Sequence, residues 1–160
     1  MPAFAFLYTD KYPLMLEADY EYAGVEQACQ YDKKKQVAGA SSQTFSFVPV
    51  NDPYQLQAAV QLGPVAVSID ASSLAFQLYN GNHIISNEHE NCGDELNHAV
   101  TVVGYNAEDP EKPYWIVRNS WGPDWGDQGY AKIMIVPGEG VCGIQTEPTY
   151  PNVYYVHKNG

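Results

Sequence analysis

Two short stretches of the sequence contain side chains that could perform chemistry. LNHAV (96–100) places His98 at the start of an apolar run, and VRNSWGPDWGDQGY (117–130) places Asn119 at the end of another. An imidazole can act as a general base, and an amide oxygen that accepts its N–H would fix the tautomer and orientation of the ring. A neutral amide suits a thiolate–imidazolium pair, because that pair already carries its own counter-charge. Under a catalytic interpretation, the two residues would be the base and its orienting group, and they leave open where a nucleophile lies.

Each residue also has a simpler interpretation. A single histidine at a strand end is often a structural residue with satisfied hydrogen bonds, and Asn-Ser near glycine is ordinary turn chemistry. Under the catalytic interpretation, the glycine-bracketed Trp121 and Trp125 could cover a His98–Asn119 hydrogen bond and exclude water from it. Such a bond is stronger in a lower local dielectric.

The two side chains can meet only if their strands are neighbours. HAVTVVGY alternates so that His98 and Val100 share one face of a strand, and in YWIVRN the residues Val117 and Asn119 share a face. Two neighbouring antiparallel strands would then bring the imidazole and the amide together at one rim of a sheet.

The remaining pattern predicts an α+β fold. Asn51-Asp52-Pro53 combines a capping side chain with proline at the first helical position, so we expect a helix there that ends at Gly63-Pro64. VAVSI then indicates a buried strand, SLAFQLY a short turn of helix, and YAKIMIV a further strand. We expect a few short helices followed by an antiparallel β-meander.

Composition argues against several functions. The chain of 160 residues carries 19 acidic and 8 basic residues, for a net charge of −11, so nucleic-acid binding is not expected. No apolar run is long enough to span a membrane, and the N-terminus lacks the pattern of a secretory signal. Three cysteines leave one over after any pair forms, which indicates a free thiol or a partner outside the chain.

Neither a metal nor a cofactor is expected. His83, His89 and His157 have no metal-ligand spacing with one another or with the cysteines. We interpret Asp124 and Asp127 as loop carboxylates, with a weak cation site as the alternative.

Taken together, these motifs resemble the second half of a papain-family (cathepsin-like) cysteine protease. The resemblance rests on LNHAV, VVGY, YWIVRNSWGPDWGDQGY and GVCGI, and it extends to GPVAVSIDA with FQLYNG, to CGDELNHAV and to the closing EPTYP. YEYAGVEQACQYD is similar to the family's Y-P-Y…C segment, with Glu21 where proline is usual. The resemblance covers nearly the whole chain.

This resemblance implies a fold and a set of roles. The fold would be the papain-like α+β fold, with residues 1–30 a remnant of the helical left domain and residues 31–160 the β-rich, barrel-like right domain. His98 and Asn119 would be catalytic, and Trp121 would shield their contact. The resemblance also implies a disulfide between Cys92 and Cys142.

By the same resemblance, the nucleophile is absent from these residues. The family's cysteine stands in a C-G-S-C-W type motif, with an oxyanion-hole glutamine a few residues earlier, and neither motif occurs here. Cys29 lacks that context, so we expect it to be unpaired within the chain and to bond to a cysteine of the absent half. The chain alone is then expected to be inactive. It would be one chain of a processed two-chain endopeptidase, a fragment of an intact one, or an inactive papain-like module with a structural or binding role.

Substrate preference and location follow from the resemblance as well. Ser68, Asn97, Ala99 and Glu147 fall at positions that line the S2 pocket, and an acidic floor would accept arginine at P2. The alternative for Glu147 is a solvated carboxylate. Peptide or protein substrates and protein inhibitors are the expected partners, besides the Cys-bearing half. A lysosomal, vacuolar or secreted location is expected for a protease, and none is indicated for an inactive module.

Overall fold

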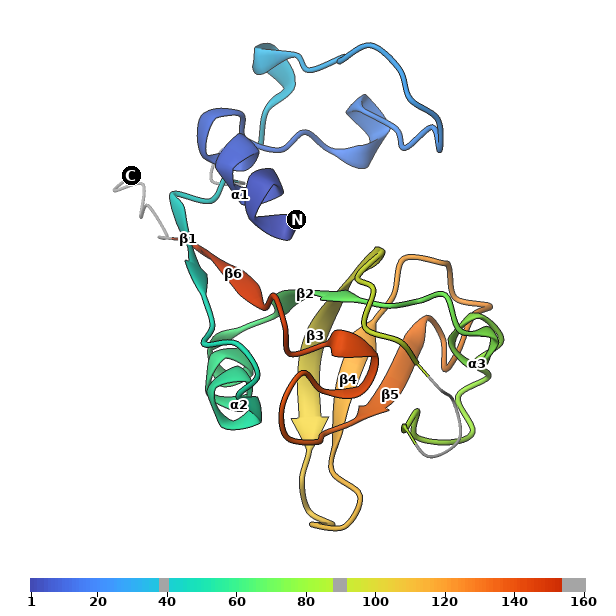
Figure 1. Cartoon of the computed structure of the whole chain (residues 1–160). Coiled ribbons are helices and arrows are strands. Elements are labelled where there is room, and N and C mark those ends of the chain that lie inside the picture. The colour runs from blue at the N-terminus through green and yellow to red at the C-terminus, as the bar shows by residue number, and fades with distance from the viewer. Residues whose placement is uncertain (38–40, 88–91, 154–160) are drawn as a thin grey trace. The chain divides into compact units, whose positions relative to one another are not determined.

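The computed structural model describes residues 1–37, 41–87 and 92–153 (Figure 1). The chain divides into two compact units. The larger unit contains residues 47–150 with Met1–Pro2, and the smaller unit contains Ala3–Ser46 with the C-terminal residues from Pro151. The boundary expected at residue 30 between a left-domain remnant and a right domain remains a prediction.

An antiparallel sheet forms the centre of the larger unit. The strands β2 (Val65–Ile69), β3 (His98–Asn106), β4 (Tyr114–Arg118) and β5 (Tyr130–Met134) pair in sequence order, each antiparallel to the next. The predicted meander is therefore confirmed. The complete order is β1-β6-β2-β3-β4-β5.

The two strands that complete the sheet are short and were not predicted. They are β1 (Thr44–Phe47) and β6 (Thr149–Asn152). The Asn152 side chain donates to Thr44 Oγ1 at 2.8 Å and to Ser46 Oγ at 3.0 Å, and Thr149 pairs with Ala66 of β2.

The core of the larger unit follows from the alternation of its strands. Val65, Val67 and Ile69 of β2 are fully buried, as is Trp115 of β4. β-branched and aromatic side chains favour a pleated surface because they pack well against their cross-strand neighbours. In β3, Val100 and Val102 are buried, so the strand that begins with His98 is anchored in the core two residues later.

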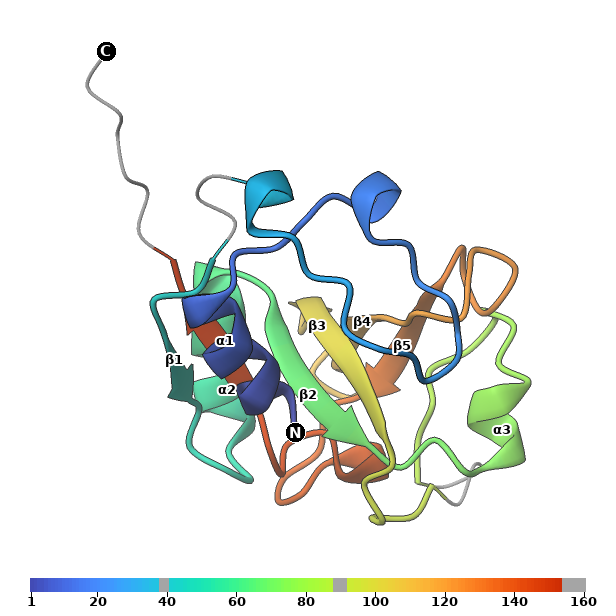
Figure 2. The same ribbon diagram turned by 90° about the horizontal axis from the view of Figure 1, so that it is seen from above.

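Two helices of the larger unit lie on opposite sides of the strands β2–β5 (Figures 1 and 2). α2 (Pro53–Leu62) begins where it was predicted, because the Asp52 side chain accepts hydrogen bonds from the backbone of Tyr54 and Gln55. α3 (Leu74–Gln77) is a single turn capped by Ser73, whose side chain accepts the Phe76 N–H.

A short 3₁₀ turn ends the core of the larger unit. It spans Val141–Gly143, and Cys142 adopts a left-handed backbone conformation with φ of 57°. The following Gln145 is fully buried and donates to the carbonyl oxygens of Val136 and Gly138.

The described part of the smaller unit has three short helical elements. They are α1 (Pro2–Lys11), whose first residue belongs to the larger unit, and two 3₁₀ turns at Glu17–Asp19 and Lys33–Lys35. Thr9 of α1 forms a 2.6 Å hydrogen bond with Ser42, and Lys35 forms a salt bridge with Asp19 at 3.2 Å. In the described part of the chain, no helix has the length and apolarity needed to cross a membrane.

Candidate active site

The imidazole of His98 and the amide of Asn119 lie together at the end of the sheet. His98 is the first residue of β3 and pairs with Ile69 of β2. Asn119 follows the last residue of β4, and its N–H donates to the Gly129 carbonyl at 2.9 Å. The register pairs Thr101 with Arg118, so Asn119 falls diagonal to His98 on the same face. His98 Nε2 and Asn119 Oδ1 are 2.8 Å apart.

The hydrogen bonds of Asn119 determine the tautomer of His98. Oδ1 also accepts the Ser120 N–H at 2.8 Å, so the atom that faces His98 is the amide oxygen and not the NH₂ group. An amide oxygen can only accept, so His98 Nε2 carries the proton and donates it. The neutral ring then keeps its lone pair on Nδ1, which is the nitrogen left to act as a base.

Aromatic side chains surround this pair. The rings of His98 and Trp121 are 4.9 Å apart and tilted by 32°, and Trp121 is 41% exposed. The fully buried Phe76 lies 6.5 Å from the His98 ring and 5.4 Å from Trp121. The sequence suggested that Trp125 also covers the His98–Asn119 hydrogen bond, but its indole N–H is directed to α3. Its Nε1 donates to the carbonyl oxygens of Phe76 and Gln77, so it braces the end of α3 while Trp121 covers the histidine.

An open pocket of about 530 Å³ adjoins His98. It is lined by Ala71, Ser72, Gln77, Asn97, His98 and Trp121. The Gln77 side chain donates to the carbonyl oxygen of Ser72 at 3.2 Å, which ties α3 to the segment after β2. The sequence did not single out Gln77, the last residue of α3, because only the fold brings it to the pocket beside His98.

Three of the four residues expected in a substrate pocket lie together. Ser68 pairs with Ala99 across β2 and β3, and Ser68 Oγ donates to Glu147 Oε2 at 3.4 Å. Ser68 is 8% exposed and Glu147 is half-buried, so this carboxylate is not the fully solvated group of the alternative interpretation. The fourth residue, Asn97, lines the pocket beside His98.

The chain is similar to known proteins in both sequence and structure. A family model described as "Papain family cysteine protease" matches residues 1–152. The chain belongs to this family. Two relatives are Cysteine proteinase 1 of Entamoeba histolytica, 43% identical over 84% of this chain, and Cathepsin L of Sarcophaga peregrina, 41% identical over 86%.

Solved structures of the papain family share the fold. The bromelain protease from Ananas comosus, in complex with the E64 inhibitor, superimposes with a TM-score of 0.82 at 31% identity and covers 95% of this chain. Digestive procathepsin L 3 from Tenebrio molitor superimposes with a TM-score of 0.83 at 36% identity over 94% of the chain. The papain-like fold inferred from the sequence is therefore confirmed.

The chain is shorter than these proteins. It spans 41% of the Entamoeba proteinase and 39% of the Sarcophaga cathepsin. It covers 69% of the bromelain chain and 48% of the procathepsin chain.

The cysteines are placed as the papain-family resemblance implied. Cys92 and Cys142 form a disulfide that closes a loop of 50 residues, and Cys29 is free and exposed. Tyr8 is exposed, but partial desolvation of its hydroxyl raises its pKa, and the nearby Cys29 thiol raises it further. No group of three potential metal ligands occurs among residues 1–37, 41–87 and 92–153, and His89 and His157 lie outside them.

Proposed function

We propose that this chain supplies the base and the orienting amide of a cysteine endopeptidase whose nucleophilic cysteine lies on a segment outside these 160 residues. The observation that carries the proposal is the 2.8 Å hydrogen bond between His98 Nε2 and Asn119 Oδ1. It leaves Nδ1 as the proton acceptor of a ring that lies next to Trp121 and belongs to a residue lining an open pocket.

The mechanism assigns one task to each group. A docked thiol would give its proton to His98 Nδ1, and the imidazolium would stabilise the thiolate. After the thiolate attacks a peptide carbonyl, the imidazolium would protonate the leaving amine, and the neutral ring would then activate water for hydrolysis of the thioester. Asn119 would hold the ring in one orientation throughout, and Trp121 would exclude water from the Asn119 contact.

Three observations support a nucleophile on another segment. Cys92 and Cys142 are joined in a disulfide, and Cys29 lacks the Gly-Ser-Cys-Trp context of the family's nucleophile. The chain spans only 39% to 41% of the relatives named above. On α1, Phe4, Leu7 and Tyr8 are all exposed at helical spacing, which is the pattern of a stripe that packs against another element.

The proposal is tested by complementation. Residues 1–160 would be mixed with a segment that carries the papain-type C-G-S-C-W motif, and cleavage of a fluorogenic peptide would be measured. We expect no cleavage by either part alone, cleavage by the mixture, and loss of that cleavage with His98→Ala. A stable, monomeric chain that binds no such segment would instead support the inactive structural or binding module.

The pocket formed by Ser68, Ala99 and Glu147 would set the preference at P2. The half-buried carboxylate favours arginine there, because a guanidinium pairs with a carboxylate through two hydrogen bonds. Glu147→Gln should therefore slow cleavage of substrates that carry arginine at P2 and spare substrates that carry leucine there. Glu108→Gln, which removes an exposed loop carboxylate, is the matched control. Equal loss of both substrates would return Glu147 to a structural role.

Location and further partners belong to the same proposal. A disulfide persists in oxidising compartments, so a lysosomal, vacuolar or secreted protease is the setting that fits. The bromelain structure contains an inhibitor, and protein inhibitors that enter the same cleft would be natural partners of an assembled enzyme.

A further inference from the structure

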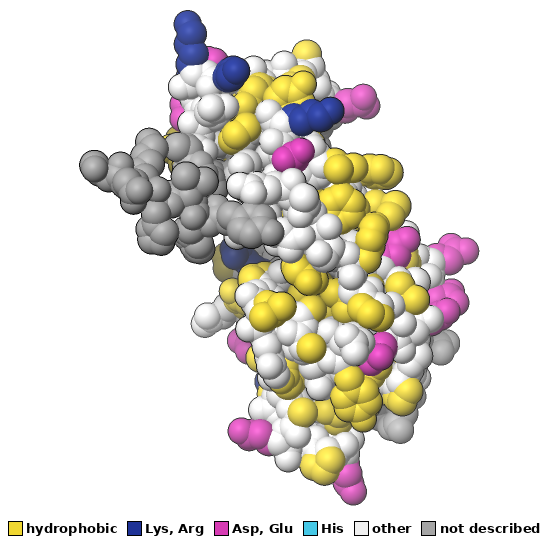
Figure 3. Space-filling model, turned by 90° about the vertical axis from the view of Figure 1, so that its left-hand side faces the viewer, with side chains coloured by type: hydrophobic (Ala, Val, Ile, Leu, Met, Phe, Trp, Pro, Cys, Tyr) yellow, Lys and Arg dark blue, Asp and Glu magenta, His cyan; other side chains and the backbone are white. Residues whose placement is uncertain are grey.

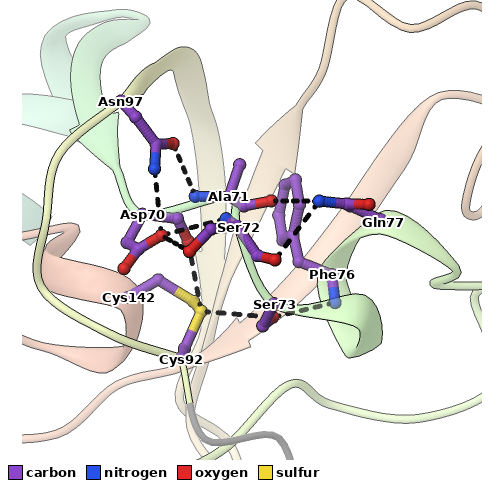
Figure 4. Close-up of a disulfide and its surroundings, with 9 residues drawn as sticks. All are labelled: Asp70, Ala71, Ser72, Ser73, Phe76, Gln77, Cys92, Asn97 and Cys142. Carbon is purple, nitrogen blue, oxygen red and sulfur yellow. Dashed lines mark hydrogen bonds between the residues drawn. A yellow bond between two sulfur atoms is a disulfide. The ribbon is translucent and has the colours of Figure 1, made fainter.

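A buried carboxylate lies just before the residues that form the His98 pocket. Asp70 follows the last residue of β2 and is 4% exposed. Its Oδ1 accepts the Ser72 N–H at 2.9 Å, the Ser72 hydroxyl and the Asn97 side-chain NH₂ at 3.1 Å (Figure 4). One carboxylate oxygen therefore joins two segments that are 27 residues apart in the sequence.

Asn97 completes this connection through its side-chain oxygen, its side-chain NH₂ and its backbone N–H. Its side-chain oxygen accepts the Ala71 N–H at 3.0 Å while its NH₂ donates to Asp70 (Figure 4). Its own N–H donates to the Ile69 carbonyl at 3.0 Å. Asn97 directly precedes His98, so these three bonds fix the backbone where the chain enters β3.

The carboxylate is held as an anion without a cation. Among the described residues Asp70 has no salt-bridge partner, and hydrogen bonds from Ser72, with a further one from Asn97, lower its pKa. The backbone N–H of Asp70 donates to the Cys142 carbonyl at 2.9 Å, so the turn that carries the disulfide also holds the Asp70 backbone. A side chain at residue 93 would collide with Asp70, which explains glycine there.

Burial of a carboxylate that has hydrogen-bond donors but no cation as partners costs free energy, because burial disfavours the charged form. Such a group persists where it specifies one geometry. We propose that Asp70 and Asn97 form a clamp of two positioning residues that sets the orientation of His98. The proposal rests on the proposed function only in taking His98 as the base.

The clamp also shapes the adjoining pocket. Ala71, Ser72 and Asn97 are three of the six residues that line it, and all three are hydrogen-bonded within the clamp. Asn97 was expected in the S2 pocket, and this assignment gives its amide a different task.

The test is a nuclear magnetic resonance measurement on the whole chain with ¹⁵N-labelled histidine. The ring-nitrogen shifts of His98 report its tautomer, and a pH titration reports its pKa. Asp70→Ala should reduce the Nε2–H population and shift the His98 titration by about 0.5 units or more. Asn97→Ala should produce the same two changes, and the double variant should add little to either.

The matched control is Asp52→Ala. It also removes a carboxylate that accepts two backbone N–H groups, at the start of α2. It should lower the thermal midpoint and leave the His98 signals unchanged. If Asp70→Ala does not fold, Asn97→Ala carries the test alone.

An unchanged His98 tautomer and titration in a folded Asn97→Ala or Asp70→Ala variant would overturn the clamp, whatever the loss of thermal stability. This readout needs no enzyme activity, so it separates failure of the clamp from failure of the proposed function. In the complemented enzyme, Asn97→Ala should lower kcat by about tenfold or more and change KM little.

Discussion

The two units of this chain differ in how much of their own interior they contain. Among the described residues, every buried hydrophobic side chain except Ala3 lies between Val48 and Pro148, in the larger unit. Among the described residues of the smaller unit, only Ala3 and Ser42 are buried, while Phe4, Leu7 and other large apolar side chains are exposed. Figure 3 shows hydrophobic side chains at the surface of one face, among scattered acidic ones.

This difference separates two kinds of stability. In the larger unit, burial of apolar side chains offsets the conformational entropy lost on folding. Its fold and its His98–Asn119 contact are therefore intrinsic to it. The smaller unit buries too little apolar surface for that and is expected to depend on a partner. The proposed division of the catalytic residues requires a preorganised His98–Asn119 pair in this chain and a nucleophile from another segment.

The largest expected contrast between the units is in hydrogen exchange. Amides in the centre of β2 and β3 should exchange about a thousandfold more slowly than amides of α1, because core strands open only by global unfolding. Exchange of the whole chain, read by mass spectrometry of peptides, measures both at once. Addition of a Cys-bearing segment should then slow exchange in α1. Equal protection of α1 and β2 in the isolated chain would show that the smaller unit is stable by itself.

A pair of phenylalanine substitutions sharpens the same contrast. Phe76→Ala should lower the free energy of unfolding by about 3–5 kcal/mol, because the ring is fully buried beneath His98 and Trp121. Phe4→Ala, at a residue that is 67% exposed, should change it by about 0.5 kcal/mol or less in the isolated chain. Urea denaturation measures both. A large loss with Phe4→Ala alone would mean that the stripe on α1 is already packed.

Within the larger unit, Asn119→Ala should separate catalysis from stability. Its oxygen accepts from His98 and Ser120, while its side-chain NH₂ is buried and has no hydrogen-bond partner among the residues that the structure describes. Removal of that buried donor offsets part of the lost bonding, so the unfolding free energy should fall by about 1 kcal/mol or less. Turnover of the complemented enzyme should fall by about tenfold or more, since the ring loses its orientation. An unchanged kcat would contradict the orienting role.

The smallest effects are those of pH, and they have opposite signs in the two units. The pKa of Asp70 is lowered in the folded chain. Its carboxylate therefore stabilises the fold fully above the unfolded pKa of about 3.9, and this stabilisation is lost as pH falls through the folded pKa. The pKa of Tyr8 is raised, so its stabilisation is present below about 10 and is lost as pH rises beyond that value. Thermal midpoints of Asp70→Ala and Tyr8→Phe across pH measure each. The acid-side loss should vanish in Asp70→Ala, and its persistence there would assign it to other groups.

The sequence was sufficient for the elements with strong local signals. The helix α2 was predicted from Asp52 and Pro53, and the strands β2 to β5 from their β-branched alternation. The strands β1 and β6 were missed because each has four residues, and β6 contains Pro151, which lowers any strand propensity.

For the site, the motifs that contain His98 and Asn119 were readable because each is a long, specific pattern. Asp70 was missed for a physical reason. A buried aspartate is unusual in a core strand sequence, and its meaning depends on Asn97, which only the folded chain brings to it.

The most direct measurement of the central claim is the position of a thiol-directed active-site label in an assembled, active enzyme. The complex of this chain with its Cys-bearing segment would be treated with an epoxysuccinyl-peptide inhibitor of the kind that E64 represents, and the two parts would be separated and weighed by mass spectrometry. The account predicts that the label is found on the other segment, that residues 1–160 carry none, and that His98→Ala prevents labelling. A label on Cys29, or labelling of this chain by itself, would contradict it.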